Sequence, residues 1–287
     1  MESKGYARPE LVIESRALAT ALKLNDAPAP APPFTAMPMV VDVRPAESFA
    51  QGHIPGAIHL DLWGLSLIDT DEAPRRAFLW MIHHLFEQRG ISDARPVVVY
   101  EDTSGMRAAR AFWFLEYFGH PDVRVLDGGF EGWLDAKLPV TRDAIAPRPV
   151  EWKARQYSDR AASWHDVALR LESTGTVILD TRSDDEYHGR VARAKRGGAI
   201  PGAVHIEWTR NLAGDGAFKP AGELQAMYAA SGVTPDKEVV TYCQGGYRAA
   251  HSYLALRLIG FPRVRNYLGS WKEWGDREEL PIEKIGE

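Results

Sequence analysis

The chain has 287 residues, of which 45% are hydrophobic and 25% are charged, a composition typical of a globular protein. Its net charge of −5 gives no general attraction for nucleic acid or for an anionic membrane surface, so neither is expected as a partner. The single cysteine excludes internal disulfides and cysteine-rich metal sites, and no metal or other cofactor is expected.

The length and composition of the chain also bear on the number of domains and on the cellular compartment. The length allows two domains of ordinary size. No apolar run approaches the roughly 20 residues of a membrane-spanning helix, and residues 1–14 lack the apolar core of a signal peptide. Because a lone cysteine also fits a reducing compartment, we expect a cytoplasmic protein.

The first half of the chain alternates strand and helix patterns. A stretch rich in Ala and Pro, residues 27–33, is expected to form an exposed extended loop. The elements expected in chain order are a short strand or turn and then a helix over 10–24, a strand over 39–44, a turn and apolar run over 53–60, a helix over 77–89, a strand over 96–100, a helix over 107–118 and a strand over 123–126. This alternation predicts an α/β domain with a largely parallel sheet.

The second half repeats this order of motifs. Asp180-Thr181-Arg182 matches Asp42-Val43-Arg44, and an Ile-Pro-Gly-Ala motif follows each of them. From Arg107 onward, a shift of 141 residues aligns the two halves without gaps. We therefore predict two tandem copies of one domain, over residues 10–146 and 155–287, with a surface linker near 139–157.

The only cysteine lies between a strand pattern and a helix pattern. Residues 239–242 are typical of a buried strand, two glycines follow Cys243, and a helix is predicted over 249–258. Backbone N–H groups in such a turn can converge on one point, and the start of a helix adds partial positive charge. We therefore expect the Cys243 thiol to have a lowered pKa and to react as a thiolate.

The first copy carries a carboxylate where the second carries this thiol. The shift of 141 residues places Asp102 opposite Cys243, whereas aligning the tyrosines of the two strands would place Glu101 there. A carboxylate is a poor substitute for a soft sulfur nucleophile. We predict that the second copy is catalytic and that the first is inactive.

Taken together, these motifs resemble the tandem-domain rhodanese family, the thiosulfate and 3-mercaptopyruvate sulfurtransferases. The resemblance covers roughly residues 10–285 and rests on the two Asp-x-Arg motifs, the two Ile-Pro-Gly-Ala motifs, Leu126-Asp127-Gly128-Gly129 with Trp133, and residues 242–249. It implies two rhodanese-like domains, each a mainly parallel sheet flanked by helices, with a six-residue active loop, Cys243 to Arg248. It also implies ping-pong sulfur transfer through a Cys243 persulfide, from a small anionic donor to cyanide, a thiol or a protein acceptor.

The candidate substrate-binding residues lie in or near this loop. Arg248 either orients the loop or holds an anion, or it is a structural link to a carboxylate, as its twin Arg107 suggests. Arg182 follows a predicted strand, and the resemblance places an arginine of this motif near the substrate, so we expect it to bind the substrate. The remaining candidates are the loop residues Gln244, Gly245, Gly246 and Tyr247.

A basic run, a histidine and two matching tryptophans lie outside this loop. The basic run over 190–196, absent from the first copy, is interpreted as a solvated loop, with steering of anionic donors as the alternative. His53 could approach the active loop, but a structural hydrogen bond is favoured. Trp133 and Trp274 occupy matching positions and are expected in the core.

The donor follows from the charge of the loop. Residues 244–248 are neutral near the thiol and basic at their end, a pattern that matches neither the thiosulfate-type nor the mercaptopyruvate-type loop of the family. Because arginine charge suits a small dianion, we favour a thiosulfate sulfurtransferase, with 3-mercaptopyruvate as the alternative donor. The competing classes are a cysteine-loop phosphatase, whose loop has one more residue, and a sulfur-relay or interaction module.

Overall fold

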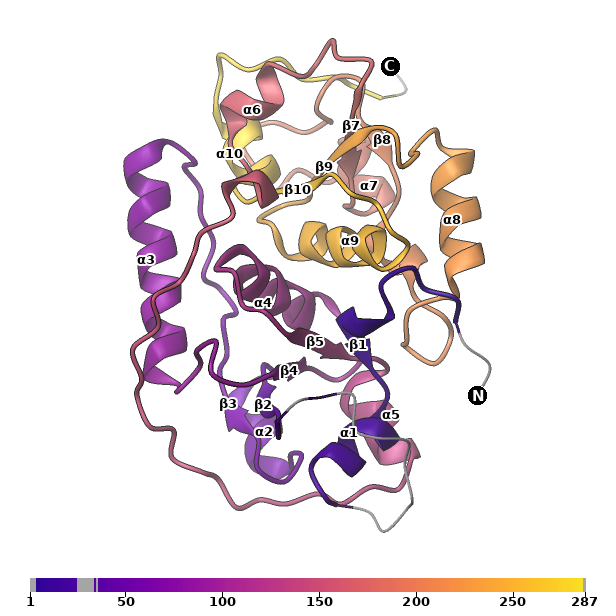
Figure 1. The fold of residues 1–287 in the computed structure, drawn as a ribbon. Helices are drawn as coiled ribbons and strands as arrows, with labels where there is room; N and C mark the ends of the chain where they lie inside the picture. The colour runs from indigo at the N-terminus through magenta and orange to yellow at the C-terminus, as the bar shows by residue number, and fades with distance from the viewer. Residues whose placement is uncertain (1–3, 25–33, 35, 286–287) are drawn as a thin grey trace.

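The structure, a computed structural model, describes residues 4–24, 34 and 36–285. The loop expected over 27–33 lies outside these residues. Within the described chain, each half forms its own five-stranded sheet, and the two halves lie one above the other in Figure 1. All strand pairs are parallel, and the strand orders β1-β5-β4-β2-β3 and β6-β10-β9-β7-β8 are equivalent, as expected for two copies of one domain.

The elements of the first half follow the expected order. The strands are β1 (Val12–Ile13), β2 (Met39–Asp42), β3 (Ile58–His59), β4 (Val97–Tyr100) and β5 (Val123–Leu126). The helices are α1 (Ser15–Ala21), α2 (Ala46–Gln51), α3 (Glu72–Gln88), α4 (Met106–Tyr117) and α5 (Gly129–Asp135), preceded by the 3-10 turn η1 (Pro9–Leu11). Helix α3 begins five residues before the predicted start, because its charged first turn carries no apolar pattern.

The second half contains the equivalent elements. Its strands are β6 (Ala161–Ala162), β7 (Thr176–Asp180), β8 (Val204–His205), β9 (Glu238–Tyr242) and β10 (Val264–Tyr267). Its helices are α6 (Trp164–Ala168), α7 (Asp184–Tyr187), α8 (Ala221–Ala230), α9 (Tyr247–Leu258) and α10 (Ser270–Asp276), with the 3-10 turns η2 (Ser158–Arg160) and η3 (Trp208–Asn211).

The central strands are buried on both faces, as parallel sheets between helices require. Strands β2 and β4 are buried at every position, as is β9 after its first residue. Trp133 and Trp274 are 0% exposed, which confirms their predicted place in the core. Among the described residues no helix combines the length and the hydrophobicity needed to cross a membrane.

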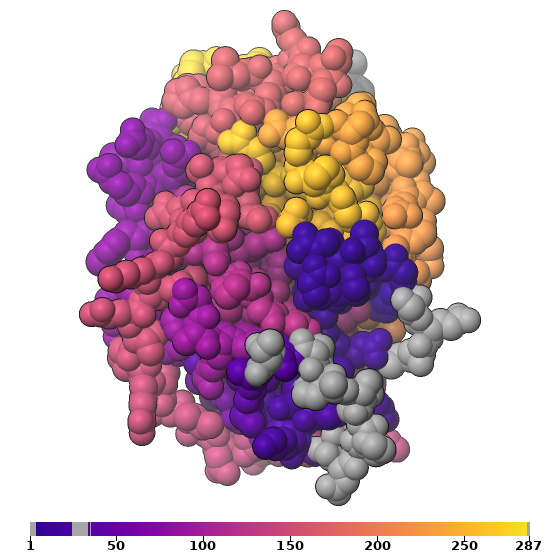
Figure 2. Space-filling model, in the orientation of Figure 1, coloured from indigo at the N-terminus to yellow at the C-terminus, as the bar shows by residue number. Residues whose placement is uncertain are grey.

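Helices α4 and α9 pack against each other between the two sheets and form the centre of the interface between the halves (Figure 1). Residues 139–157, expected as the linker, form no helix or strand and run over the outside of the molecule (Figure 2). The N-terminal segment also joins the halves, since the Arg8 N–H donates to the carbonyl of Leu258 at 3.1 Å. The loops that follow β4 and β9 each contact the central helix of the opposite half, through His251 and Arg110 respectively.

Candidate active site

Cys243 is the first residue after β9, at the carboxyl edge of the second sheet, where α/β proteins usually bind their ligands. Its N–H donates to the hydroxyl of Ser270 at 3.1 Å, and its carbonyl accepts the N–H of Trp271 at 2.8 Å. These bonds to the start of α10 fix the backbone of the cysteine. The residue is 1% exposed, so its sulfur lies at the bottom of the pocket described below.

The backbone of the loop surrounds the sulfur with N–H groups. The Gly246 N–H donates to Cys243 Sγ at 3.1 Å, and Gly246 precedes the first turn of α9. Its φ of +83° is a conformation that glycine adopts without strain. A Cβ atom here would also lie 2.7 Å from the guanidinium of Arg110 and 3.1 Å from the carbonyl of Leu268. Both the turn and its packing therefore require glycine.

The electrostatics of the loop favour the thiolate. Burial raises the pKa of the Cys243 thiol, but the positive charge of Arg248 and the N–H groups of Ala249, Gly245 and Gly246 lower it more, and the net pKa lies below the usual value. Hydrogen bonds and positive charge stabilise the anion and leave the neutral thiol unaffected. The cysteine therefore has the environment expected of a nucleophile.

Arg248 is tied to a carboxylate. Its guanidinium donates to both oxygens of Glu186 in α7, at 2.5 and 2.9 Å. Burial of Glu186 raises the pKa of its carboxyl, but the bonds from Arg248 and Ser183 outweigh this and bring the pKa to about 2. The structural link considered for Arg248 is therefore present, and the same guanidinium places its charge beside Cys243.

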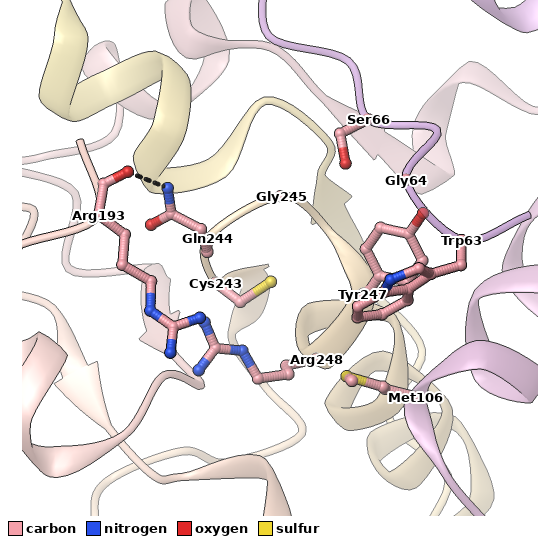
Figure 3. A pocket seen from close by; sticks show the side chains of 10 residues that line it. All are labelled: Trp63, Gly64, Ser66, Met106, Arg193, Cys243, Gln244, Gly245, Tyr247 and Arg248. Carbon is pink, nitrogen blue, oxygen red and sulfur yellow. Dashed lines mark hydrogen bonds between the residues drawn. The ribbon is translucent and has the colours of Figure 1, made fainter.

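The pocket above the sulfur has a volume of about 400 Å³ and is lined by both halves of the molecule (Figure 3). The second half contributes Cys243, Gln244, Gly245, Tyr247, Arg248 and Arg193, and the first half contributes Trp63, Gly64, Ser66 and Met106. The structure thus brings together the predicted loop residues, with Gly246 beneath them as a donor to the sulfur. No charged residue of the first half lines this pocket.

Two loop side chains fasten the loop to its surroundings. The Tyr247 hydroxyl donates to the carbonyl of Leu62 at 2.7 Å, which anchors the loop to the first half of the chain. The Gln244 amide donates to the carbonyl of Arg193 at 2.8 Å, shown as the dashed line in Figure 3. The buried Gln244 Oε1 has no hydrogen-bond partner.

Arg193, in the basic run over 190–196, lines the pocket, although it was not among the candidate substrate-binding residues. Figure 3 shows its guanidinium next to that of Arg248, beside Cys243. Its Nε atom lies 3.7 Å from Glu186, so the two arginines share one carboxylate. Arg196 of the same run is bonded to the protein, since it donates to the carbonyls of Gly275, Leu280 and Trp274. The side chains of Arg190 and Arg193 are nonetheless 57% and 62% exposed, so the run is largely solvated, as expected, and also places one arginine at the pocket.

Arg182 does not line the pocket, and we correct the expectation that it contacts the substrate. Its guanidinium donates to both oxygens of Asp180 at 2.5–3.0 Å, and the residue is 1% exposed. Arg44 is bonded in the same way to Asp42 in the first half. The arginine follows its strand as predicted, but the aspartate two residues earlier binds it. The Asp-x-Arg motif is thus a structural brace in both copies.

His53 is also buried, and its ring nitrogens face the carbonyls of Phe49 at 2.9 Å and Asp143 at 3.3 Å. These are the structural hydrogen bonds favoured from the sequence. His53 does not line the pocket around Cys243.

In the first half, Glu101 occupies the place of the cysteine. It follows β4 as Cys243 follows β9, since Tyr100 pairs with Asp42 as Tyr242 pairs with Asp180. Five residues, 101–105, separate β4 from α4, whereas four residues, 243–246, separate β9 from α9. The first loop is therefore one residue longer, and the alignment of the two tyrosines is correct rather than the one that selects Asp102.

The carboxylate of Glu101 fills its own loop. It accepts the N–H groups of Arg107 at 2.5 Å and Ala108 at 3.0 Å, at the start of α4. Burial raises the pKa of this carboxyl to about 7, although those two bonds act in the opposite direction. The N–H groups that would stabilise a bound anion in this loop are thus occupied by the protein itself.

Comparison with known proteins identifies the family. The family model described as "Rhodanese-like domain" matches twice, over residues 22–136 and 163–277. The chain belongs to the rhodanese family. The thiosulfate sulfurtransferase of Azotobacter vinelandii is 34% identical over 245 residues, 85% of this chain and 90% of that protein. The sulfur carrier protein TtuD of Thermus thermophilus is 36% identical over 249 residues, 81% of this chain and 86% of that protein.

A solved structure shares its fold with nearly the whole chain. The anaerobic ergothioneine biosynthesis enzyme of Chlorobium limicola, in complex with trimethyl histidine, superposes with a TM-score of 0.84 and 23% identity. This match covers 96% of this chain and 71% of that enzyme. At this level of identity the similarity concerns the fold alone.

Proposed function

We propose that this protein is a thiosulfate sulfurtransferase that carries the transferred sulfur as a persulfide on Cys243. Its curated relatives support sulfurtransferase activity, since several are named thiosulfate sulfurtransferase at 32–36% identity. The observation that carries the proposal is the position of Cys243 Sγ, 3.1 Å from the Gly246 N–H, at the bottom of a pocket that also holds two arginines. This geometry suits an anionic sulfur both before and after transfer.

The reaction balances in two steps. The Cys243 thiolate attacks the outer sulfur of thiosulfate, the sulfur–sulfur bond of the donor breaks, and sulfite leaves with the electron pair. The persulfide anion that remains occupies the same N–H cradle as the thiolate. A thiophilic acceptor, cyanide or a thiolate, then takes the terminal sulfur and restores the Cys243 thiolate. Covalent relay divides one difficult transfer into two easier ones.

The charge of the pocket favours thiosulfate over 3-mercaptopyruvate. Beside the Cys243 sulfur, Arg193 and Arg248 contribute two positive charges and share the single carboxylate of Glu186, so these three side chains carry one positive charge in excess. A small dianion gains more from this excess than the monoanion of a 2-oxo acid does. The departing sulfite, also an anion, is stabilised by the same guanidinium groups.

We also infer that the first domain takes no sulfur and that the boundaries at 10–146 and 155–287 separate an inactive domain from a catalytic one. Glu101 supports this, because a carboxylate fills the first loop. A protein acceptor is a second candidate for the second step, since one relative is named a sulfur carrier protein.

Mass spectrometry of the intact protein after incubation with thiosulfate tests the proposal. We expect a gain of about 32 Da, located at Cys243, reversed by cyanide with release of thiocyanate and abolished in Cys243→Ser. Turnover of thiosulfate and of 3-mercaptopyruvate, measured in parallel, identifies the donor. A protein that never gains this mass from thiosulfate but does so from 3-mercaptopyruvate is the alternative enzyme. Hydrolysis of an aryl phosphate without any persulfide would indicate the phosphatase class instead.

A further inference from the structure

A buried arginine of the first half lies against the active loop of the second half. Arg110 belongs to α4 and is 0% exposed. Its Nη1 donates to the carbonyl of Gly245 at 2.9 Å, and its Nη2 donates to the carbonyl of Leu65 at 2.9 Å. Its guanidinium carbon also lies 3.9 Å from the centre of the Tyr247 ring. Arg110 thus contacts two residues of the loop that carries Cys243, Gly245 and Tyr247.

The charge of Arg110 has no carboxylate partner among the residues that the structure describes. Its charged and titratable neighbours are Tyr247 and Cys243, and its buried Nε atom has no hydrogen-bond partner. An arginine stays protonated in proteins, and a buried charge without a counter-charge is costly. The Cys243 thiolate is the group that can provide this counter-charge.

The other copy provides an internal comparison. Counted from the starts of α4 and α9, His251 is equivalent to Arg110, and Ser104 and Gly245 both lie two residues before the helix. His251 Nε2 lies 2.7 Å from the carbonyl of Ser104, so each central helix braces the loop of the opposite half at the same position. Burial lowers the pKa of His251 to about 4, and its imidazole is therefore neutral near pH 7. At these two equivalent positions, the cation lies against the loop that carries the thiol and the neutral imidazole lies against the other loop.

We propose that Arg110 is a positioning residue that braces the active loop across the domain interface and provides the buried positive charge that stabilises the Cys243 thiolate. The first half, which has no reactive thiol of its own, thereby increases the reactivity of the second. This role of Arg110 rests on the proposed sulfurtransferase function in one respect, that the Cys243 thiolate is the nucleophile.

The other ionisable groups that face Cys243 come from the second half. They are Arg248 and Tyr247 of the loop and Arg193 of the insertion, with Glu186 of α7 behind the two arginines. The lining residues of the first half are Trp63, Gly64, Ser66 and Met106, all uncharged. A change in charge at Arg110 therefore isolates the contribution of the first half.

The pH dependence of Cys243 alkylation by iodoacetamide tests this role, and the single cysteine makes the measurement specific. Arg110→Gln removes the charge but keeps an N–H donor for Gly245, whereas Arg110→Lys keeps the charge. We expect the midpoint of the alkylation rate against pH to rise by about one pH unit in Arg110→Gln. Alkylation of this variant should be roughly tenfold slower than that of the wild type below both midpoints and equally fast above them. Arg110→Lys should stay close to the wild type. Arg110→His, which introduces the residue of the other copy, should shift like the glutamine variant and replaces it if that variant does not fold.

His251→Gln is the matched control, because it alters the equivalent contact beneath the other loop and should leave the midpoint unchanged. Unchanged midpoints in folded Arg110→Gln or Arg110→His would overturn the proposal, as would an equal shift in His251→Gln. Alkylation requires no sulfur donor. A wild-type protein that forms no persulfide would therefore contradict the proposed function and leave this test intact.

Discussion

Glu186 holds together the charged side chains of the active loop. It receives two hydrogen bonds from Arg248, lies 3.7 Å from Arg193, and accepts the hydroxyl of Ser183 at 3.0 Å. Its side chain is 3% exposed, so solvent screens these interactions only weakly. The carboxylate therefore fixes where the positive charge of the pocket lies relative to Cys243.

The depressed pKa of Glu186 predicts a pH-dependent contribution to stability. The folded pKa is about 2, below the ordinary value for glutamate, so the contribution is complete above the unfolded pKa and is lost as the pH falls toward 2. We expect Glu186→Gln to lower the free energy of unfolding by about 3 kcal/mol at pH 7 and by about half as much at pH 3. Urea unfolding at several pH values measures this difference.

Glu72→Gln is the control for that measurement, because the side chain of Glu72 is 84% exposed. It should change the free energy of unfolding by less than about 0.5 kcal/mol at every pH. A Glu186→Gln penalty that stays constant between pH 7 and pH 3 would show that the ion pair with Arg248 does not stabilise the fold.

The sequence located the proposed nucleophile but only part of its surroundings. Cys243 was predictable because a strand, two glycines and a helix frame it in consecutive residues. The position of Arg193 was not predictable, because its insertion has no counterpart in the first copy and only the folded structure shows that it lines the pocket. Arg182 shows the opposite error: its place at the end of β7 was predictable, but its capture by Asp180 depends on side-chain geometry.

At the scale of elements, the turn between β9 and α9 determines where the sulfur lies. The order of strands and helices was predictable from the apolar runs, and both sheets pair their central strands in the same way. The exact alignment of the two loops was not predictable. The extra residue of the first loop lies between a strand and a helix, where the sequence has no periodic pattern that would reveal it. The tight second turn depends on Gly246, whose φ is +83°.

We predict that Gly246→Ala abolishes persulfide formation and destabilises the protein. An added Cβ would combine a strained φ with contacts of 2.7 Å to Arg110 and 3.1 Å to Leu268, and it would displace the N–H that bonds to the sulfur. The free energy of unfolding should fall by about 2 kcal/mol, measured by urea unfolding alongside the mass gain from thiosulfate.

Gly202→Ala is the control that separates the cost of a strained φ from the loss of the N–H beside the sulfur. Gly202 also has a positive φ, +70°, but a Cβ there meets nothing within 4 Å. It should cost about 1 kcal/mol and leave persulfide formation unchanged. Full activity in Gly246→Ala would show that the N–H of this residue is not needed by the sulfur.

At the scale of the whole molecule, the site exists only where the two halves meet. The first half supplies four lining residues and the brace from Arg110, so neither half forms the pocket alone. The sequence repeat predicted two similar domains, but a repeat does not specify how its copies pack. The crossed contacts of α4 and α9 with the opposite loops were therefore beyond the sequence interpretation.

A second cluster, on the far end of these helices, holds the halves together. Glu116 of α4 accepts the hydroxyl of Tyr253 at 2.5 Å and pairs with Arg160 at 2.9 Å and Arg257 at 3.1 Å, three residues of the second half. Removing the one carboxylate would leave two guanidinium groups facing each other in a largely buried space, which is strongly destabilising.

We therefore expect Glu116→Gln to lower the free energy of unfolding by about 3 kcal/mol, and to separate the unfolding of the two halves because the cluster lies on their interface. Calorimetry should show one transition for the wild type and a broadened or double transition for the variant. Glu131→Gln, at an exposed position of α5, should leave the profile unchanged. Because Glu116 does not line the pocket, Cys243 alkylation below the transition should also be unchanged. A single transition at the wild-type temperature in Glu116→Gln would show that the halves are coupled by apolar packing of α4 and α9 alone.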